Sequence, residues 1–129
     1  MLEIKKKPND INSFVNKLFE VRDMVHFAHL SCNTLSVHLI LNEYYDKILE
    51  QADKFVECYQ GRYEVIYNFN ISVQHTKNTD ICKYLQLFGK FIRDNRYIAV
   101  EKECTALQAF IDEIELSLFQ TLYKLENLK

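Results

Sequence analysis

The chain has 129 residues, 48% of them hydrophobic, with 16 basic and 18 acidic side chains. This length suits a single domain that buries about two-thirds of its unfolded surface, and the apolar content argues against a disordered chain. Two glycines and one proline are too few for the turns of an all-β fold, and the near balance of charge argues against a nucleic-acid partner.

The first predicted helix begins just after Pro8, where Asn9 or Asp10 can cap it, and it ends near Cys32. Its apolar residues recur at the three- and four-residue steps of an amphipathic helix. They are Ile11, Phe14, Val15, Leu18 and Val25.

The second predicted helix begins near Leu35, where Asn33 and Thr34 offer capping side chains. Gly61 is expected just past its end, in the position where glycine commonly terminates a helix. The apolar and aromatic residues of this segment keep the helical spacing at Val37, Leu41, Tyr44, Ile48, Ala52, Phe55 and Tyr59.

The segment 62–78 differs from the rest of the chain because its apolar residues alternate with polar ones. The apolar positions are Tyr63, Val65, Tyr67, Phe69, Ile71 and Val73. Period-two alternation favours an extended backbone. A lone strand would have no partner in this chain, so we expect an ordered, extended connection.

A third helix is predicted from a cap at Asn78 or Thr79 to about Asn95, and a fourth from about Tyr97 to Leu128. A glycine within the third helix, Gly89, costs roughly 1 kcal/mol relative to alanine, which close packing would explain. The expected fold is therefore all-α, with four helices.

We expect one domain over 1–129, with a short tail at 1–8 and a long crossover at 62–78 between the second and third helices. The four cysteines form no C-x-x-C pair, so they are expected to be reduced. No apolar signal segment and no stretch of about 18 uncharged apolar residues is present. These features predict a cytoplasmic protein without a membrane partner.

Four residues of metal-ligating types lie on the first two helices: His26, His38, Asp53 and Glu57. On a straight helix, His38 and Asp53 lie roughly 60° apart in azimuth and about 22 Å apart along the axis. They cannot reach one ion within one chain. A two-fold axis that pairs two copies of this helix antiparallel would bring His38 of one chain near the carboxylates of the other, which hints at a metal site shared between subunits.

The segment HFAHLSCNTLSVHLILNEYYDKILEQADKFVECYQG, from His26 to Gly61, resembles Dps-type mini-ferritins of the ferritin-like superfamily. Their pattern is a His, a second His twelve residues on, an Asp four further, then D-x-x-x-E and a final Gly. The stretch CTALQAFIDEIELSLFQTLYKLENL is similar to the last helix of that family in pattern only. The chain is also similar to short Dps-like proteins encoded by phages.

The resemblance implies a ferritin-like four-helix bundle with a long crossover, assembled as a homo-oligomer with a two-fold interface. It implies metal ligands at His26, His38, Asp53 and Glu57, with His29, Asn42 and Asp46 as additional candidates. The ion would be iron or another divalent metal such as zinc or manganese, since imidazole and carboxylate suit all three. Asn42 stands where the family has Asp, so any ferroxidase activity would be weakened.

Two interpretations remain open. The first is a Dps-like oligomer that binds iron and oxidises it slowly. The second is a ferritin-like bundle that has lost this chemistry and serves as a structural or assembly protein, with virion proteins as partners and the host cytoplasm or the virion as its location. In the second, His26 and His29 are hydrogen-bonded residues at the edge of the core, and Asp53 and Glu57 form a solvated acidic face.

Overall fold

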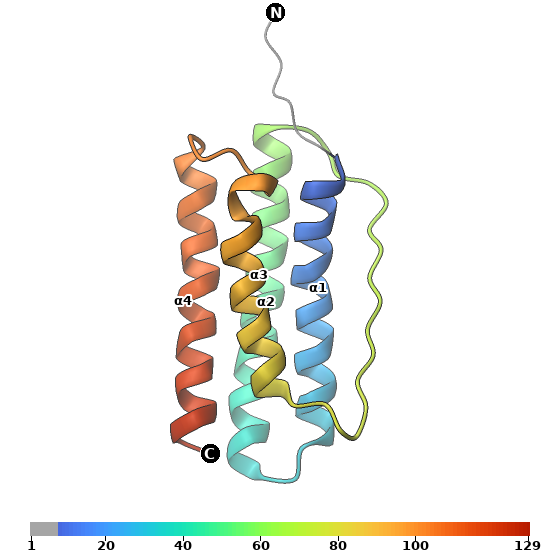
Figure 1. Cartoon of the computed structure of the whole chain (residues 1–129), viewed down its shortest axis with the longest axis vertical. Coiled ribbons are helices and arrows are strands. Elements are labelled where there is room, and N and C mark those ends of the chain that lie inside the picture. The colour runs from blue at the N-terminus through green and yellow to red at the C-terminus, as the bar shows by residue number, and fades with distance from the viewer. Residues whose placement is uncertain (1–7) are drawn as a thin grey trace, which may run out of the picture.

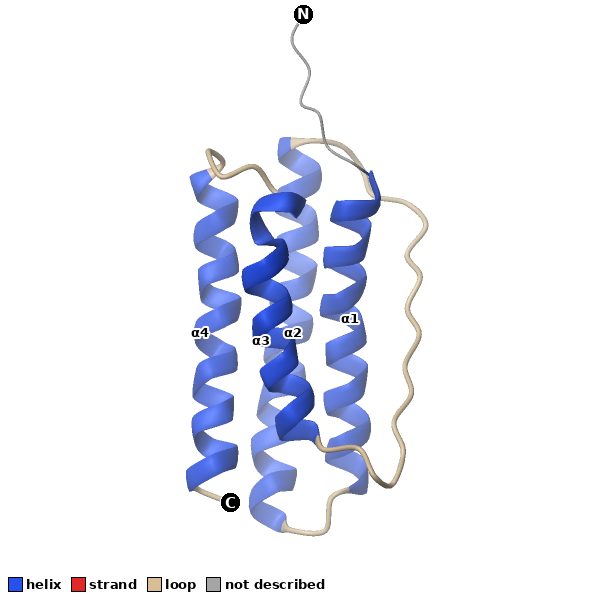
Figure 2. Ribbon diagram, viewed as in Figure 1, coloured by secondary structure: helices blue, strands red, loops and turns tan. Residues whose placement is uncertain are grey.

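The computed structural model describes residues 8–129 and shows four helices with no strand in that part of the chain (Figure 1, Figure 2). These helices are α1 (Pro8–Ser31), α2 (Leu35–Arg62), α3 (Ile81–Ala99) and α4 (Thr105–Asn127). The prediction of an all-α four-helix bundle is therefore confirmed. None of the helices in this part is long and apolar enough to cross a membrane.

Each helix runs antiparallel to the helices that it contacts (Figure 1). α1 packs against α2 and α3, and α4 packs against the same two helices. This arrangement is possible because the connection between α2 and α3 is long: it returns along the outside of α1 to the opposite end of the bundle (Figure 2). The predicted crossover is thus observed, and it spans 63–80 rather than 62–78.

The start of α1 differs from the prediction. Pro8 is already the first helical residue, so Asn9 and Asp10 lie inside the helix instead of capping it. Proline is well suited to the first helical position, because its fixed φ is helical and the missing N–H has no intrahelical partner there. The rest of the predicted tail, including the lysines at 5–7, lies outside the described residues.

The expected cap of α2 is confirmed, whereas its expected terminator is wrong. Thr34 accepts a hydrogen bond from the main-chain nitrogen of Val37 at 3.4 Å. The helix continues through Gly61, whose φ is not positive, so this glycine is not a left-handed terminator. The helix ends after Arg62, where the Tyr63 ring packs on Tyr59 at 4.7 Å and its hydroxyl donates to Glu101.

The boundary between α3 and α4 was also predicted wrongly. Asp80, not Asn78 or Thr79, caps α3 by accepting a hydrogen bond from the nitrogen of Lys83 at 3.1 Å. α3 continues to Ala99, so Tyr97 belongs to this helix and α4 begins only at Thr105.

The side chain of Gln108 explains why α3 continues this far. Its Nε2 donates to the main-chain oxygens of Arg96 at 3.2 Å and Val100 at 2.9 Å. The Arg96 oxygen also accepts from the N–H of Val100, whereas the Val100 oxygen lies just past the helix, where helical partners run out. A side chain of the following helix therefore donates hydrogen bonds to the main-chain oxygens at the end of α3.

The core is formed by the apolar faces of all four helices. At its centre the Phe14 ring lies 5.5 Å from Phe55 and 6.0 Å from Phe91, which joins α1, α2 and α3. A Cβ atom added to Gly89 would lie 3.3 Å from Leu118 Cδ2. That distance is tight, so the glycine allows α3 and α4 to pack closely, as its position within a helix suggested.

The crossover is held on α1 by a few specific contacts. Asn70 donates its main-chain N–H to Asn16 Oδ1 at 3.1 Å, and the Phe69 ring meets Phe19 edge-on at 6.1 Å. Ile66 is the one buried apolar side chain between positions 64 and 75. The crossover therefore lies on the helices as an extended strap.

Candidate functional site

Two histidines pair at the end of the bundle where α1 turns into α2. His29 Nδ1 donates to the main-chain oxygen of His38 at 2.9 Å, and His38 Nδ1 donates to that of His29 at 3.0 Å. Their rings stack with centroids 3.8 Å apart. A carbonyl oxygen only accepts, so each Nδ1 must carry the proton, and in the neutral ring Nε2 keeps its lone pair. Each Nε2 then has a lone pair that could bind an ion, although His29 is buried whereas His38 is half-buried.

The short turn between α1 and α2 brings the two rings together. Cys32 donates its main-chain N–H to the oxygen of Ala28 at 3.0 Å, which closes the last turn of α1. The oxygen of His29 belongs to that final turn, where carbonyls lack helical partners. His38, in the first turns of α2, donates to this oxygen, so the pair also fastens the two helix ends together.

His26 lies beside this pair, nearer the surface. Its ring stacks on Tyr45 of α2 at 4.4 Å and lies 6.2 Å from the His29 ring. The guanidinium of Arg22 lies over the same tyrosine at 5.6 Å. His26, His29 and His38 thus form one cluster between α1 and α2, whereas the predicted set joined His26 and His38 to the carboxylates of α2.

The carboxylates lie elsewhere on the same helix. Asp53 and Glu57 are exposed on α2. At the helical rise, they are about 22 Å and 28 Å from His38 along the axis. Asn42 is half-buried and Asp46 is exposed, and both lie between the two groups. α2 therefore carries a half-buried imidazole, packed against α1, near one end and two exposed carboxylates toward the other.

One chain does not assemble the predicted ligand set. Among the residues that the structure describes, no three His, Cys, Asp or Glu side chains are grouped so that they could hold a metal ion. The four cysteines are also free thiols. A site with His38, Asp53 and Glu57 therefore needs a second copy of the chain, as the helix spacing indicated.

The sequence did not reveal the packing partners of the histidines. The His26 ring stacks on Tyr45, and the Arg22 guanidinium lies over the same tyrosine ring. No sequence motif predicts either contact. The neighbouring Tyr44 is buried, and its hydroxyl has no hydrogen-bond partner in the described part of the chain. Burial raises the pKa of Tyr44 above its ordinary value, so this phenol stays neutral.

A family model matches most of the chain. A family described as a family of unknown function, DUF5856, matches residues 29–125. The match includes His29, His38, Asp53 and Glu57 and begins after His26. No curated protein and no solved structure matches the chain.

Proposed function

We propose that this chain, which belongs to the DUF5856 family, is a homo-oligomeric four-helix bundle that binds a divalent metal ion, iron foremost, between two subunits. The observation that supports this most directly is the hydrogen bond from His38 Nδ1 to a main-chain carbonyl. Metal-binding imidazoles commonly donate their second nitrogen to a carbonyl, which fixes the ring and leaves the other nitrogen to the ion.

The exposed carboxylates supply the other half of the proposed site. Asp53 and Glu57 are one helical turn apart on α2 and project from its exposed surface. Because a two-fold interface repeats each contact, antiparallel packing of two α2 helices would place them near His38 of the partner copy. His26, which lies next to His29 in the same cluster, completes the proposed ligand set, with His29, Asn42 and Asp46 as additional candidates.

A second candidate function is that of a structural or assembly protein without metal chemistry, such as one that contacts virion proteins. The reciprocal bonds between His29 and His38 favour it, because they satisfy one nitrogen of each ring and fasten α1 to α2 without any ion. Asn42 favours it as well, because an amide brings no negative charge to balance a ferric ion. The experiments below separate the two candidates.

The proposed site requires an oligomer. We expect analytical ultracentrifugation at micromolar concentrations to give a mass of two or more chains, because His38 and Asp53 cannot meet within one chain. In an Asp46→Arg variant, which changes the α2 face, the oligomer should dissociate at higher concentrations than the parent oligomer does. Asp94→Arg, on the exposed surface of α3, should leave the oligomer unchanged. A monomeric parent over this concentration range would rule out the shared site.

The carboxylates should be required for metal binding. In protein purified without chelator and loaded with one equivalent of Fe²⁺ or Zn²⁺, the double variant Asp53→Ala, Glu57→Ala should lose stoichiometric metal, because neutral imidazoles alone leave the ion's charge unbalanced. Elemental analysis after gel filtration measures this. The matched control, Asp94→Ala with Glu103→Ala, removes two exposed carboxylates elsewhere and should keep the metal. Equal metal content in all three proteins would support the structural candidate.

Asn42 should limit iron oxidation. We expect slow or undetectable oxidation of Fe²⁺ in the parent and a measurable gain in Asn42→Asp, because a carboxylate one turn beyond His38 adds negative charge for Fe³⁺. The rise of near-ultraviolet ferric absorbance after anaerobic Fe²⁺ loading and addition of peroxide follows the reaction. Asn95→Asp, a half-buried asparagine on α3, is the control. Absence of a gain in Asn42→Asp, with no metal bound to either protein, would favour the structural candidate, and a parent as fast as an intact mini-ferritin would show that Asn42 does not limit oxidation.

A further inference from the structure

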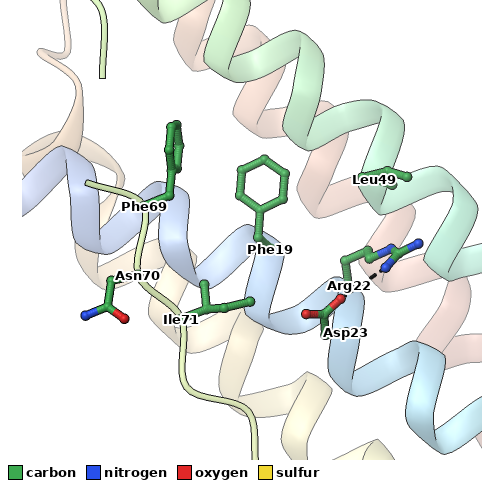
Figure 3. A pocket seen from close by; sticks show the side chains of 7 residues that line it. All are labelled: Phe19, Arg22, Asp23, Leu49, Phe69, Asn70 and Ile71. Atoms are coloured by element: carbon green, nitrogen blue, oxygen red, sulfur yellow. Dashed lines mark hydrogen bonds and ion pairs between the residues drawn. The ribbon is translucent and has the colours of Figure 1, made fainter. Parts of the chain in front are cut away.

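A hollow lies between the crossover and the α1–α2 surface, apart from the proposed metal ligands. Its volume is about 370 Å³, and the side chains that line it are Phe19, Arg22, Asp23, Leu49, Phe69, Asn70 and Ile71. Figure 3 shows Phe69 and Ile71 of the crossover beside Phe19 of α1, with Leu49 of α2 and the Arg22–Asp23 pair beyond them. A volume of this order is within the range of small-molecule sites, roughly 300–1,000 Å³.

The walls of the hollow are mainly apolar and are partly open to water. Phe19 and Phe69 meet edge-on at 6.1 Å, and Phe69 and Ile71 remain 52% and 38% exposed. Aromatic rings and branched aliphatic groups favour an apolar body, and a ring would add the edge-to-face contacts that phenylalanines favour. An occupant of this kind would cover apolar surface that the fold leaves in contact with water.

The Arg22–Asp23 ion pair lines the hollow, and both side chains are partly exposed. Arg22 Nη1 donates to Asp23 Oδ1 at 3.1 Å, whereas Arg22 Nε is buried without a hydrogen-bond partner in the described part of the chain. Because Nε is shielded from water, an occupant would meet the partly exposed remainder of the guanidinium, whose other N–H groups can donate to it. The carboxylate of Asp23 can accept a further hydrogen bond. Because this pair is already neutral, an anionic head group would lie beside the Asp23 carboxylate and be repelled.

We propose that this hollow binds a small neutral molecule with an aromatic or branched apolar body and a carboxamide-like head. The carbonyl oxygen of the head accepts from Arg22, and its N–H donates to Asp23. The apolar body lies against Phe19, Leu49 and Phe69. None of the lining residues is a proposed metal ligand, although Arg22 also lies over Tyr45, the ring on which His26 stacks.

The chain contains no tryptophan, so a single introduced tryptophan would report binding by its fluorescence without background from other tryptophans. In a Phe69→Trp variant, whose only tryptophan would line the hollow, titration with 4-phenylbutanamide should change the emission with a saturable curve. Arg22→Met in this background keeps an apolar stem but removes the guanidinium, and it should weaken binding by at least about tenfold. The anion 4-phenylbutanoate, with the same apolar body, should also bind several-fold more weakly than the amide.

Two controls separate binding from loss of structure. Arg93→Met, at an exposed arginine of α3, should leave the titration unchanged, and thermal unfolding by circular dichroism should show that every variant folds. Saturation-transfer NMR of 4-phenylbutanamide with the parent protein checks that the introduced tryptophan does not create the site. A titration without saturation, or an unchanged affinity in Arg22→Met, would overturn the proposal. Equal affinity for the carboxylate would overturn the neutral head group.

Discussion

Replacing Phe55 with alanine is expected to lower the free energy of unfolding by about 4 kcal/mol. The Phe55 side chain on α2 is fully buried and lies against Phe14 of α1 at 5.5 Å and Phe110 of α4 at 6.4 Å. Its removal would leave a cavity where three helices meet, and the well-packed neighbours can fill only part of it. Urea unfolding followed by circular dichroism measures the change.

The matched control is Phe119→Ala on α4, because that ring is 47% exposed. We expect its effect to be about 1 kcal/mol or less, since much of the ring is already in contact with water. Similar losses for the two variants would contradict the placement of Phe55 at the centre of the core.

Replacing Gln108 with leucine should have the second-largest effect, a loss of about 3 kcal/mol. The Gln108 amide is buried and donates to the main-chain oxygens of Arg96 and Val100, while its oxygen accepts from Arg96 Nε at 2.9 Å. Leucine has a similar volume but leaves these carbonyls and the buried guanidinium with fewer partners. Arg96 would keep its contacts with the main-chain oxygen of residue 108 at 2.8 Å, with Asp112 at 2.7 Å and with Glu115 at 3.5 Å, but its Nε would lose its acceptor.

Urea unfolding of Gln108→Leu, compared with Gln120→Leu at an exposed position of the same helix, tests this role. Hydrogen exchange adds a local measurement: amides in the last turn of α3 should lose protection in Gln108→Leu only. An unchanged free energy of unfolding would show that water replaces the glutamine without cost.

Local sequence signals predicted the helices well where the signal was strong. The cap at Thr34 is in place, and the apolar spacing of α1 and α2 matches their buried faces. Gly61 misled the prediction because glycine also occurs inside helices, and here its φ is not positive. Tyr97 misled it for a different reason, since the end of α3 depends on Gln108, a residue of the following helix.

The sequence by itself determined the helical class, the approximate extents of α1 and α2 and the extended crossover, because helical and extended periodicities are local properties of the chain. It also determined that His38 and Asp53 cannot meet within one chain, because the helical rise sets their separation. Only the tertiary structure decided that His29 and His38 pair across the turn and that Phe69 lines one hollow with Arg22 and Leu49. These contacts depend on how separate helices and the crossover pack against one another. The periodicity of apolar residues indicates which face of a helix is buried, but not which side chains meet there.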